Sequence, residues 1–242
     1  MAEPKWLQDM NPEEYLKEDF EATGHSRYTV DGLEKNDPEW LDKAAAKVNA
    51  AEGDDYVKLD SGLLTVNQIN WMLRNTFGEM TYVDDNNQFL WYNRPQDPNY
   101  KMKAGRVPAQ VGNTMGAVHP DIRDVIPNAK KVVHALRTKE GGHDEVWMPV
   151  PTGNLTELVL HYYKRVEDEE GNYMGIYEWV QDIYPFVKYF CEVTGQKLVV
   201  DPDATTGATY RRNSDPDAKT GPSTKADAAK EEVKAAEPEA TS

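Results

Sequence analysis

Hydrophobic side chains in the middle of the chain follow two spacings, one helical and one strand-like. Apolar residues three or four positions apart at 66–73 and over 122–136 predict two amphipathic helices. Thr65 and Gln68 have the capping-box spacing that begins the first helix, and Pro127 indicates that the main part of the second begins near that residue. Strand-like runs at 79–83 and 88–92, joined by an Asp/Asn turn, predict a β-hairpin.

Three more strand-like runs follow at 143–150, 155–166 and 173–183, separated by turn-forming sequences. Proline and glycine in 93–118 predict loops or very short helices, and 184–193 suits a short helix or an extended exit. The order is therefore two strands, loops, a helix and three strands. It predicts an α+β fold in which a five-stranded antiparallel sheet carries helices on one face.

Charge divides the 242-residue chain into three parts. Residues 1–60 hold much of the acidic excess and contain two proline-led helix starts, so we expect a partly helical N-terminal arm that docks on another surface. Residues 61–195 are expected to form the domain. Residues 196–242 contain almost no large apolar side chains, and we expect a disordered tail there.

Composition excludes several classes of function. The net charge of −15 disfavours nucleic acid and anionic membranes as partners, and no apolar run is long enough to span a bilayer. The single cysteine, Cys191, excludes a disulfide framework and multi-cysteine zinc sites. The acidic N-terminus lacks the hydrophobic stretch of a signal peptide, so we expect a cytoplasmic protein. No phosphate-binding, zinc-protease or nucleophile-elbow motif is present, so we do not expect an enzyme.

Four segments together resemble the PAS domain family. These are the apolar strand and Asp/Asn turn of 80–88, Val111–Thr114 followed by His119 and Pro120, the turn of 168–175, and Gln181–Ile183 at the end of the last strand. The glycine at 112, the His-Pro pair and the proline inside the next helix resemble the PAS subtype attached to bacterial hemerythrin-like domains. The resemblance covers roughly residues 65–190, and no hemerythrin-like part accompanies it.

The resemblance implies a stand-alone sensory or signalling protein that holds a small ligand or heme between the helical side and the sheet. His119 is the candidate axial heme ligand; its alternatives are a local hydrogen bond at the helix start or a contact to another ligand. Heme is the first candidate cofactor, and no non-heme metal site is expected. The expected lining residues are Met115, Val118, His119, Val132, Val133, Leu136, Met148, Leu160 and Ile176.

The other face of the predicted sheet is aromatic. Alternation places Trp147, Tyr163, Tyr177 and Trp179 together on it. Because a solvent-facing sheet surface is normally polar, we expect the N-terminal arm or a second subunit to cover this face. The alternative function is a ligand-free adaptor that acts as a dimer or as a scaffold for a protein partner.

Overall fold

The computed structural model describes residues 4–21, 30, 32–97, 99–119, 125–150 and 156–199. Predictions for the tail beyond 199, for Pro120, and for the turn that begins at Pro151 therefore lie outside the described residues. The chain divides into two compact units. The larger contains Trp6–Val146 and Tyr162–Val180, and the smaller contains Met1–Lys5, Trp147–His161 and Gln181–Ser242.

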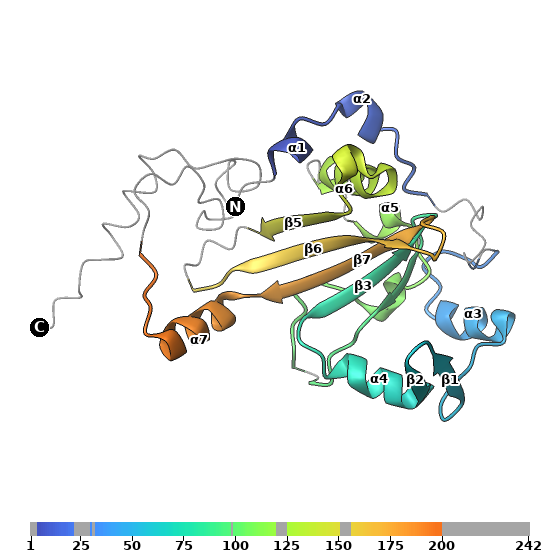
Figure 1. The fold of residues 1–242 in the computed structure, drawn as a ribbon. Helices are drawn as coiled ribbons and strands as arrows, with labels where there is room; N and C mark the ends of the chain where they lie inside the picture. Colours follow the sequence, from blue (N-terminus) through green and yellow to red (C-terminus); the bar gives the residue numbers. More distant parts are fainter. Residues whose placement is uncertain are drawn as a thin grey trace, which may run out of the picture. The chain divides into compact units, whose positions relative to one another are not determined.

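Helices and strands follow the predicted order, with additions before residue 66 (Figure 1). The helices are α1 (Lys5–Gln8), α2 (Pro12–Tyr15), α3 (Trp40–Val48), α4 (Val66–Arg74), α5 (Met115–Val118), α6 (Val125–Thr138) and α7 (Tyr184–Thr194). The strands are β1 (Tyr56–Leu59), β2 (Gly62–Thr65), β3 (Glu79–Asp84), β4 (Phe89–Tyr92), β5 (Glu145–Val150), β6 (Val159–Glu167) and β7 (Tyr173–Asp182). Short 3-10 turns lie at Pro108–Gln110 and Glu140–Gly142.

Five strands form one antiparallel sheet in the order β4-β3-β7-β6-β5, which confirms the predicted fold class. The first and last segments of the predicted sheet thus meet in space, because β3 pairs with β7. Their register places Glu79 opposite Val180, Thr81 opposite Glu178 and Val83 opposite Ile176. All six of these residues are buried, so this pairing defines the inward face of the sheet.

Local sequence explains the best-predicted elements. Thr65 and Gln68 close the predicted capping box at the start of α4, each accepting a hydrogen bond from the other's backbone N–H. The turn between β3 and β4 is fixed by Asp84, whose carboxylate accepts from the backbone N–H of Asn86 and Gln88. Asn87 adopts a φ of 60°, a left-handed conformation that asparagine tolerates.

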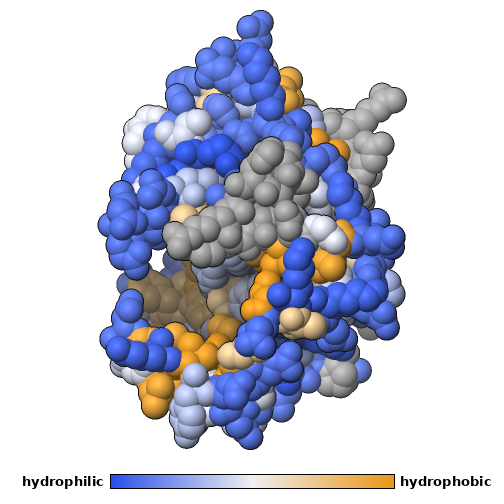
Figure 2. All heavy atoms as spheres, turned by 90° about the vertical axis from the view of Figure 1, so that its right-hand side faces the viewer, coloured by the Kyte–Doolittle hydropathy of each residue, from blue (hydrophilic) through white to orange (hydrophobic). Residues whose placement is uncertain are grey.

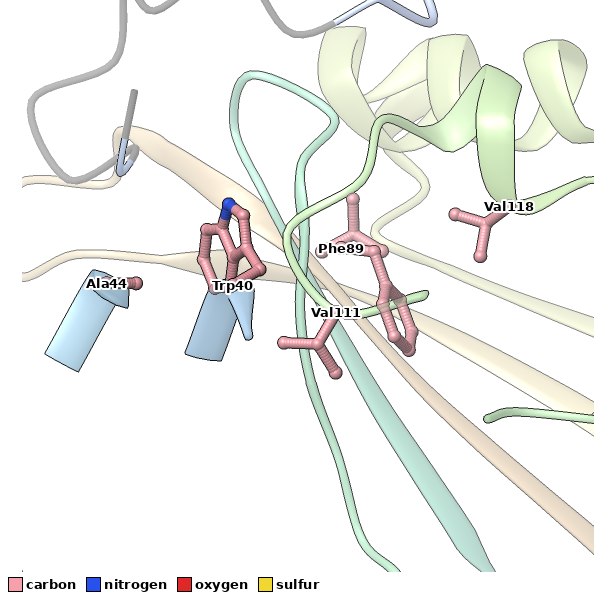
Figure 3. Packing of buried hydrophobic residues seen from close by; sticks show 6 residues of the cluster. Trp40, Ala44, Phe89, Val111 and Val118 are labelled. Carbon is pink, nitrogen blue, oxygen red and sulfur yellow. The ribbon is translucent and has the colours of Figure 1, made fainter. Parts of the chain in front are cut away.

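The segment around α3 completes the hydrophobic core of the larger unit. Trp40 belongs to a buried hydrophobic cluster with Ala44, Phe89, Val111 and Val118, and only 4% of Trp40 remains exposed (Figure 3). Gly112 makes this packing possible: its φ is +88°, and a Cβ built there would lie 2.0 Å from the Trp40 ring. The N-terminal arm is therefore part of the core of the unit and not an appendage.

Residues 6–21 lie along α6 (Figure 1). Glu18 accepts hydrogen bonds from Arg137 Nε at 3.1 Å and lies 2.9 Å from His134 Nδ1, while Lys130 donates to the Leu16 carbonyl. Leu7 is fully buried. The arm thus docks as predicted, but on a helix. The expectation that it covers the aromatic sheet face is wrong for these residues.

Trp179 on that aromatic face is covered by a segment about a hundred positions earlier in the chain. Its indole Nε1 donates to the Phe77 carbonyl at 3.0 Å, and Gly78 approaches the ring so closely that a Cβ would lie 2.3 Å from Nε1. The segment that leads into β3 therefore packs on Trp179.

The β1–β2 hairpin and α4 carry large side chains that remain exposed. We call this the hairpin surface; it comprises Tyr56, Leu59, Leu63, Trp71, Met72 and Phe77. Figure 2 views the side of the molecule that bears these elements, and hydrophobic side chains gather on its lower part. Among the described residues, no helix has the length and apolarity needed to cross a membrane.

Replacing Trp40 by alanine should destabilise the protein strongly. Removing a buried tryptophan from a core costs about 3–5 kcal/mol of unfolding free energy. Urea unfolding followed by circular dichroism measures this loss. Trp71→Ala is the matched control, because Trp71 is 56% exposed and should change stability by no more than about 0.5 kcal/mol. Equal effects of the two substitutions would contradict the role assigned to Trp40.

Candidate functional site

The inward face of the sheet contains charge where a hydrophobic core is expected. Glu178 is central on β7 and lies between the buried side chains of Ile176 and Val180 at alternate positions. Its carboxylate pairs with Arg106 Nη2 at 2.9 Å, and the exposed fractions of the two side chains are 11% for Arg106 and 7% for Glu178. Such a pair must compensate a desolvation cost of several kcal/mol per ion. Its presence at the centre of the sheet marks this region as the candidate site.

The guanidinium of Arg106 has a hydrogen-bond donor without a partner among the described residues. Its guanidinium lies 5.4 Å from the centre of the Phe89 ring, which supplies a cation–π contact. Its Nε is buried and has no hydrogen-bond partner among the described residues. A buried donor without a partner costs about 1–3 kcal/mol, so such atoms in native proteins require an explanation.

Tyr163 joins this pair from β6. It hydrogen-bonds with Glu178, and burial raises the pKa of its phenol well above the ordinary value, with the negative charge of Glu178 adding to the shift. Tyr163 therefore lies on the face of Glu178. Since Tyr177 and Trp179 flank Glu178 along β7, they point to the opposite face. The prediction that Tyr163 shares their face is wrong.

The register between β6 and β7 explains this difference. Alternation assigns faces within one strand, but which residues of two strands share a face depends on their register. At one end of the pair, Ile183 N–H donates to the Leu158 carbonyl. Carried along the two strands, this register places odd-numbered residues of β6 opposite even-numbered residues of β7, so Tyr163 lies on the face of Glu178.

His119 lies at the C-terminal end of α5, close to the same charges. Its Nδ1 is 2.9 Å from the Met115 carbonyl, which can only accept, so Nδ1 carries the proton and Nε2 keeps its lone pair. Burial lowers the pKa of this imidazole; the Met115 hydrogen bond opposes the shift, and the positive charge of Arg106 adds to it. His119 is thus held as a neutral acceptor near the ion pair. We call Arg106, His119, Tyr163 and Glu178 the interior cluster.

Glu79 positions the loop that carries Arg106. Its buried carboxylate accepts hydrogen bonds from the backbone N–H groups of Lys103 and Ala104 and from the Tyr100 hydroxyl at 3.0 Å. Burial and the charge of Glu79 raise the pKa of Tyr100 to about 12. The loop of 100–106 is therefore fixed at the base of the sheet, which holds Arg106 over Phe89.

The protonation state of His119 fits an axial heme ligand, but its surroundings do not fit a porphyrin. A free Nε2 lone pair is what iron ligation requires. A porphyrin also needs a broad apolar slot beside that nitrogen, whereas the charges of Arg106 and Glu178 act directly on the His119 ring. The cluster is better matched to a small polar molecule than to heme.

The other predicted lining residues fall into two groups. In the larger unit, Val118, Val132, Val133, Leu136 and Ile176 are buried, and Met115 packs against the core around Trp40. Val118 contributes to the same core and lies next to His119 in sequence. Met148 and Leu160 belong to the smaller unit, where Leu160 is buried and Met148 is half-buried. Trp147, also in the smaller unit, is 45% exposed.

Sequence reasoning missed Arg106 and Glu178. A signal for Glu178 existed, because it is a charged residue at an inward position of an otherwise apolar alternation on β7. For Arg106 no signal existed, because it lies in an irregular loop 72 positions before its partner.

Comparison with known proteins agrees with this architecture. Residues 69–184 match the family model of the PAS domain. A crystal structure of a C-terminal domain from Streptococcus mutans is 33% identical, covers 57% of this chain and 99% of that chain, and superposes with a TM-score of 0.50. Residues 69–184 of this chain thus form a PAS-like domain.

Two more distant structures also match. The PAS domain of Bordetella pertussis BvgS is 16% identical, covers 53% of this chain and 95% of that chain, and gives a TM-score of 0.32. The Vibrio cholera VqmA–ligand–DNA complex is 16% identical, covers 60% of this chain and 63% of that chain, and gives a TM-score of 0.34. No curated protein matches the sequence.

His119 should make the protein less stable in acid. Because its pKa is lowered in the folded state, the unfolded chain takes up a proton first as pH falls through about 6.5, and this uptake favours unfolding. His119→Asn, which can still donate to the Met115 carbonyl, should reduce the loss of stability between pH 7.5 and pH 5. Urea midpoints across this range measure the effect. His143→Asn controls for loss of a histidine elsewhere; an unchanged pH profile in His119→Asn would contradict the assignment.

Proposed function

We propose that this protein is a PAS sensory protein that binds a small polar molecule at the interior cluster and signals through protein contact. The observation that carries the proposal is the buried Nε of Arg106, a donor with no partner among the described residues. A bound acceptor would remove the cost of that unsatisfied group, and this cost favours occupation. The resemblance to PAS domains supports a sensory function, and the interior cluster indicates which chemical groups the ligand carries.

The cluster also restricts the class of ligand. Glu178 already neutralises Arg106, so a further negative charge on the ligand would meet a carboxylate close by. A neutral molecule avoids this repulsion. Arg106 Nε offers a donor, while His119 Nε2 offers an acceptor. We therefore infer an uncharged ligand with a carbonyl next to an N–H, as in an amide or a nitrogen heterocycle.

Binding would signal only if it favours one state of the domain over another. Arg106 and Glu178 come from a loop and a central strand, so a ligand that completes the hydrogen bonding of Arg106 would stabilise the packing of the loop against β7. The proposal retains the sequence-based expectations that the protein is cytoplasmic, is not an enzyme and resembles the hemerythrin-associated PAS subtype. In the adaptor alternative, the cluster binds nothing and Arg106 Nε is satisfied by water.

Native mass spectrometry of the gently purified full chain, followed by calorimetric titration of any released molecule, tests this proposal. A neutral amide or nitrogen heterocycle should bind the wild type and bind Arg106→Lys at least tenfold more weakly, because lysine preserves the charge but not the Nε donor. Arg94→Lys is the matched control in an exposed arginine and should bind as the wild type does.

Three results would reject the proposal. These are no bound molecule and no binding from a fragment library, binding that is equal in Arg106→Lys and the wild type, or displacement of the ligand by hemin. A Soret band that shifts on adding hemin and is lost in His119→Ala would instead assign the site to heme.

A further inference from the structure

Four consecutive residues of the N-terminal arm cross the larger unit from α6 to α5 (Figure 1). We call residues 18–21 the strap. Each residue of the strap makes a polar contact: Glu18 with Arg137 of α6, Asp19 with Asn87 in the turn after β3, Phe20 with Gly116 of α5, and Glu21 with Thr114 at the start of α5. In the contact at Gly116, the backbone N–H donates to the Phe20 carbonyl at 3.0 Å. The strap therefore lies directly on α5, the helix that ends at His119.

Gly116 shows how closely the strap approaches α5. A Cβ built at Gly116 would lie 2.8 Å from Glu21 Oε1 and 3.5 Å from the Phe20 carbonyl oxygen. The backbone of Gly116 is helical, a conformation that any residue adopts, and glycine weakens a helix relative to alanine. Glycine at this position is therefore explained by the contact with the strap and not by the conformation of the helix.

Phe20 covers the part of the interior cluster that reaches the surface. Only 5% of Phe20 is exposed, and its ring centre lies 6.4 Å from that of His119. Within the cluster, Glu178 is buried, whereas His119 remains partly exposed. A molecule that approaches the cluster along His119 must therefore pass the Phe20 ring.

Opposite charges hold this part of the arm on α6. Residues 6–21 contain six acidic residues and one lysine, whereas α6 contains two lysines and Arg137 and no acidic residue. Glu18 is the central contact, because one of its carboxylate oxygens lies 3.1 Å from Arg137 Nε and the other lies 2.9 Å from His134 Nδ1. Salt screens an attraction of this kind, and removing the negative charge of Glu18 weakens it further.

The hydrophobic anchors of the arm lie before and after the strap in the chain. Leu7 and Met10 precede the strap and are buried, and Trp40 follows it in the core of the larger unit. Within the strap, Phe20 is the only hydrophobic side chain. The strap can therefore lift from α5 while the anchored residues on both sides of it stay in place.

We propose that the strap gates the interior cluster: it lifts to admit the small molecule and otherwise lies closed over His119. This inference rests on the proposed function and adds the regulation of the same site. A gate of this kind sets the rates at which a ligand enters and leaves. Because the strap precedes the PAS match at 69–184, this control comes from a segment outside the matched domain.

Amide hydrogen exchange of the full chain at constant pH measures the lifting of the strap. The Gly116 amide should exchange at least tenfold faster in Glu18→Gln than in the wild type, because the substitution removes the charge that pairs with Arg137. The amides of β7 should keep their wild-type rates in this variant. Raising sodium chloride from about 50 to 500 mM should accelerate Gly116 exchange in the wild type.

Glu167→Gln is the matched control for Glu18→Gln. Glu167 likewise pairs with two cations, Lys139 Nζ at 2.8 Å and Arg165 Nε at 2.6 Å, but it lies at the end of β6. Exchange of the Gly116 amide in this variant should equal that in the wild type. Equal Gly116 exchange in the two variants would overturn the proposal.

A disulfide that fastens the strap to α5 tests the gate itself. A Cβ at Gly116 would lie 3.7 Å from the Phe20 Cβ, a separation typical of disulfides. In a Cys191→Ser background, Phe20→Cys combined with Gly116→Cys should therefore oxidise to a closed strap. The Arg106 Nε–H should exchange with water at least tenfold more slowly in the oxidised form than after reduction. Both forms lack the Phe20 ring, so the comparison isolates the lifting of the strap.

Neither measurement needs a ligand, so this inference and the proposed function can fail separately. Equal exchange of the Arg106 Nε–H in the oxidised and reduced forms, or failure of the two cysteines to pair, would overturn the gate. Slower exchange in the oxidised form, together with no ligand from a fragment library, would support the gate and reject the proposed function.

Discussion

Arg106 and Glu178 form a buried ion pair at the centre of the sheet, and neighbouring residues in the interior of the larger unit hold this pair in place. The charges need each other, because one left alone would cost several kcal/mol. Tyr163 donates to the same carboxylate, Phe89 faces the guanidinium, and Glu79 fixes the loop that brings Arg106 into place. Each of these contacts restricts the pair to one geometry. In that geometry the buried Nε of Arg106 has no partner among the described residues, and the proposed ligand would accept a hydrogen bond from it.

The N-terminal segment packs over the outside of this interior. Trp40 fills the space over Gly112, and Glu18 joins Arg137 and His134 of α6. Residues that precede the PAS match at 69–184 are thus needed to complete its core. A fragment cut at the family boundary would expose Phe89 and Val111, and so would not represent the site in the full chain.

The sequence predicted the elements that depend on contacts between residues close in the chain, and it did not predict the contacts between distant residues. Thr65 and Gln68 are three positions apart, and the turn at Asp84 is equally local, so α4 and the β3–β4 hairpin could be recognised from residue types alone. Tyr163 was assigned to the wrong face because the register between β6 and β7 decides which of their residues share a face, and no residue type encodes that register. Arg106 could not be assigned, since its partner lies 72 positions away. The same distance effect hid the docking of Glu18 on α6.

The NMR signal of the Arg106 Nε–H tests the proposed ligand contact most directly, because arginine Nε–H groups give their own signals in nitrogen–proton spectra. Among the slowly exchanging Nε–H signals of the ¹⁵N-labelled full chain, one should disappear in Arg106→Lys and remain in Arg94→Lys. Titration with the neutral amide or heterocycle that binds should shift this signal downfield, as a new hydrogen bond forms. A rapidly exchanging Arg106 signal, or one that no binding molecule moves, would contradict the claim that this buried donor is the ligand contact.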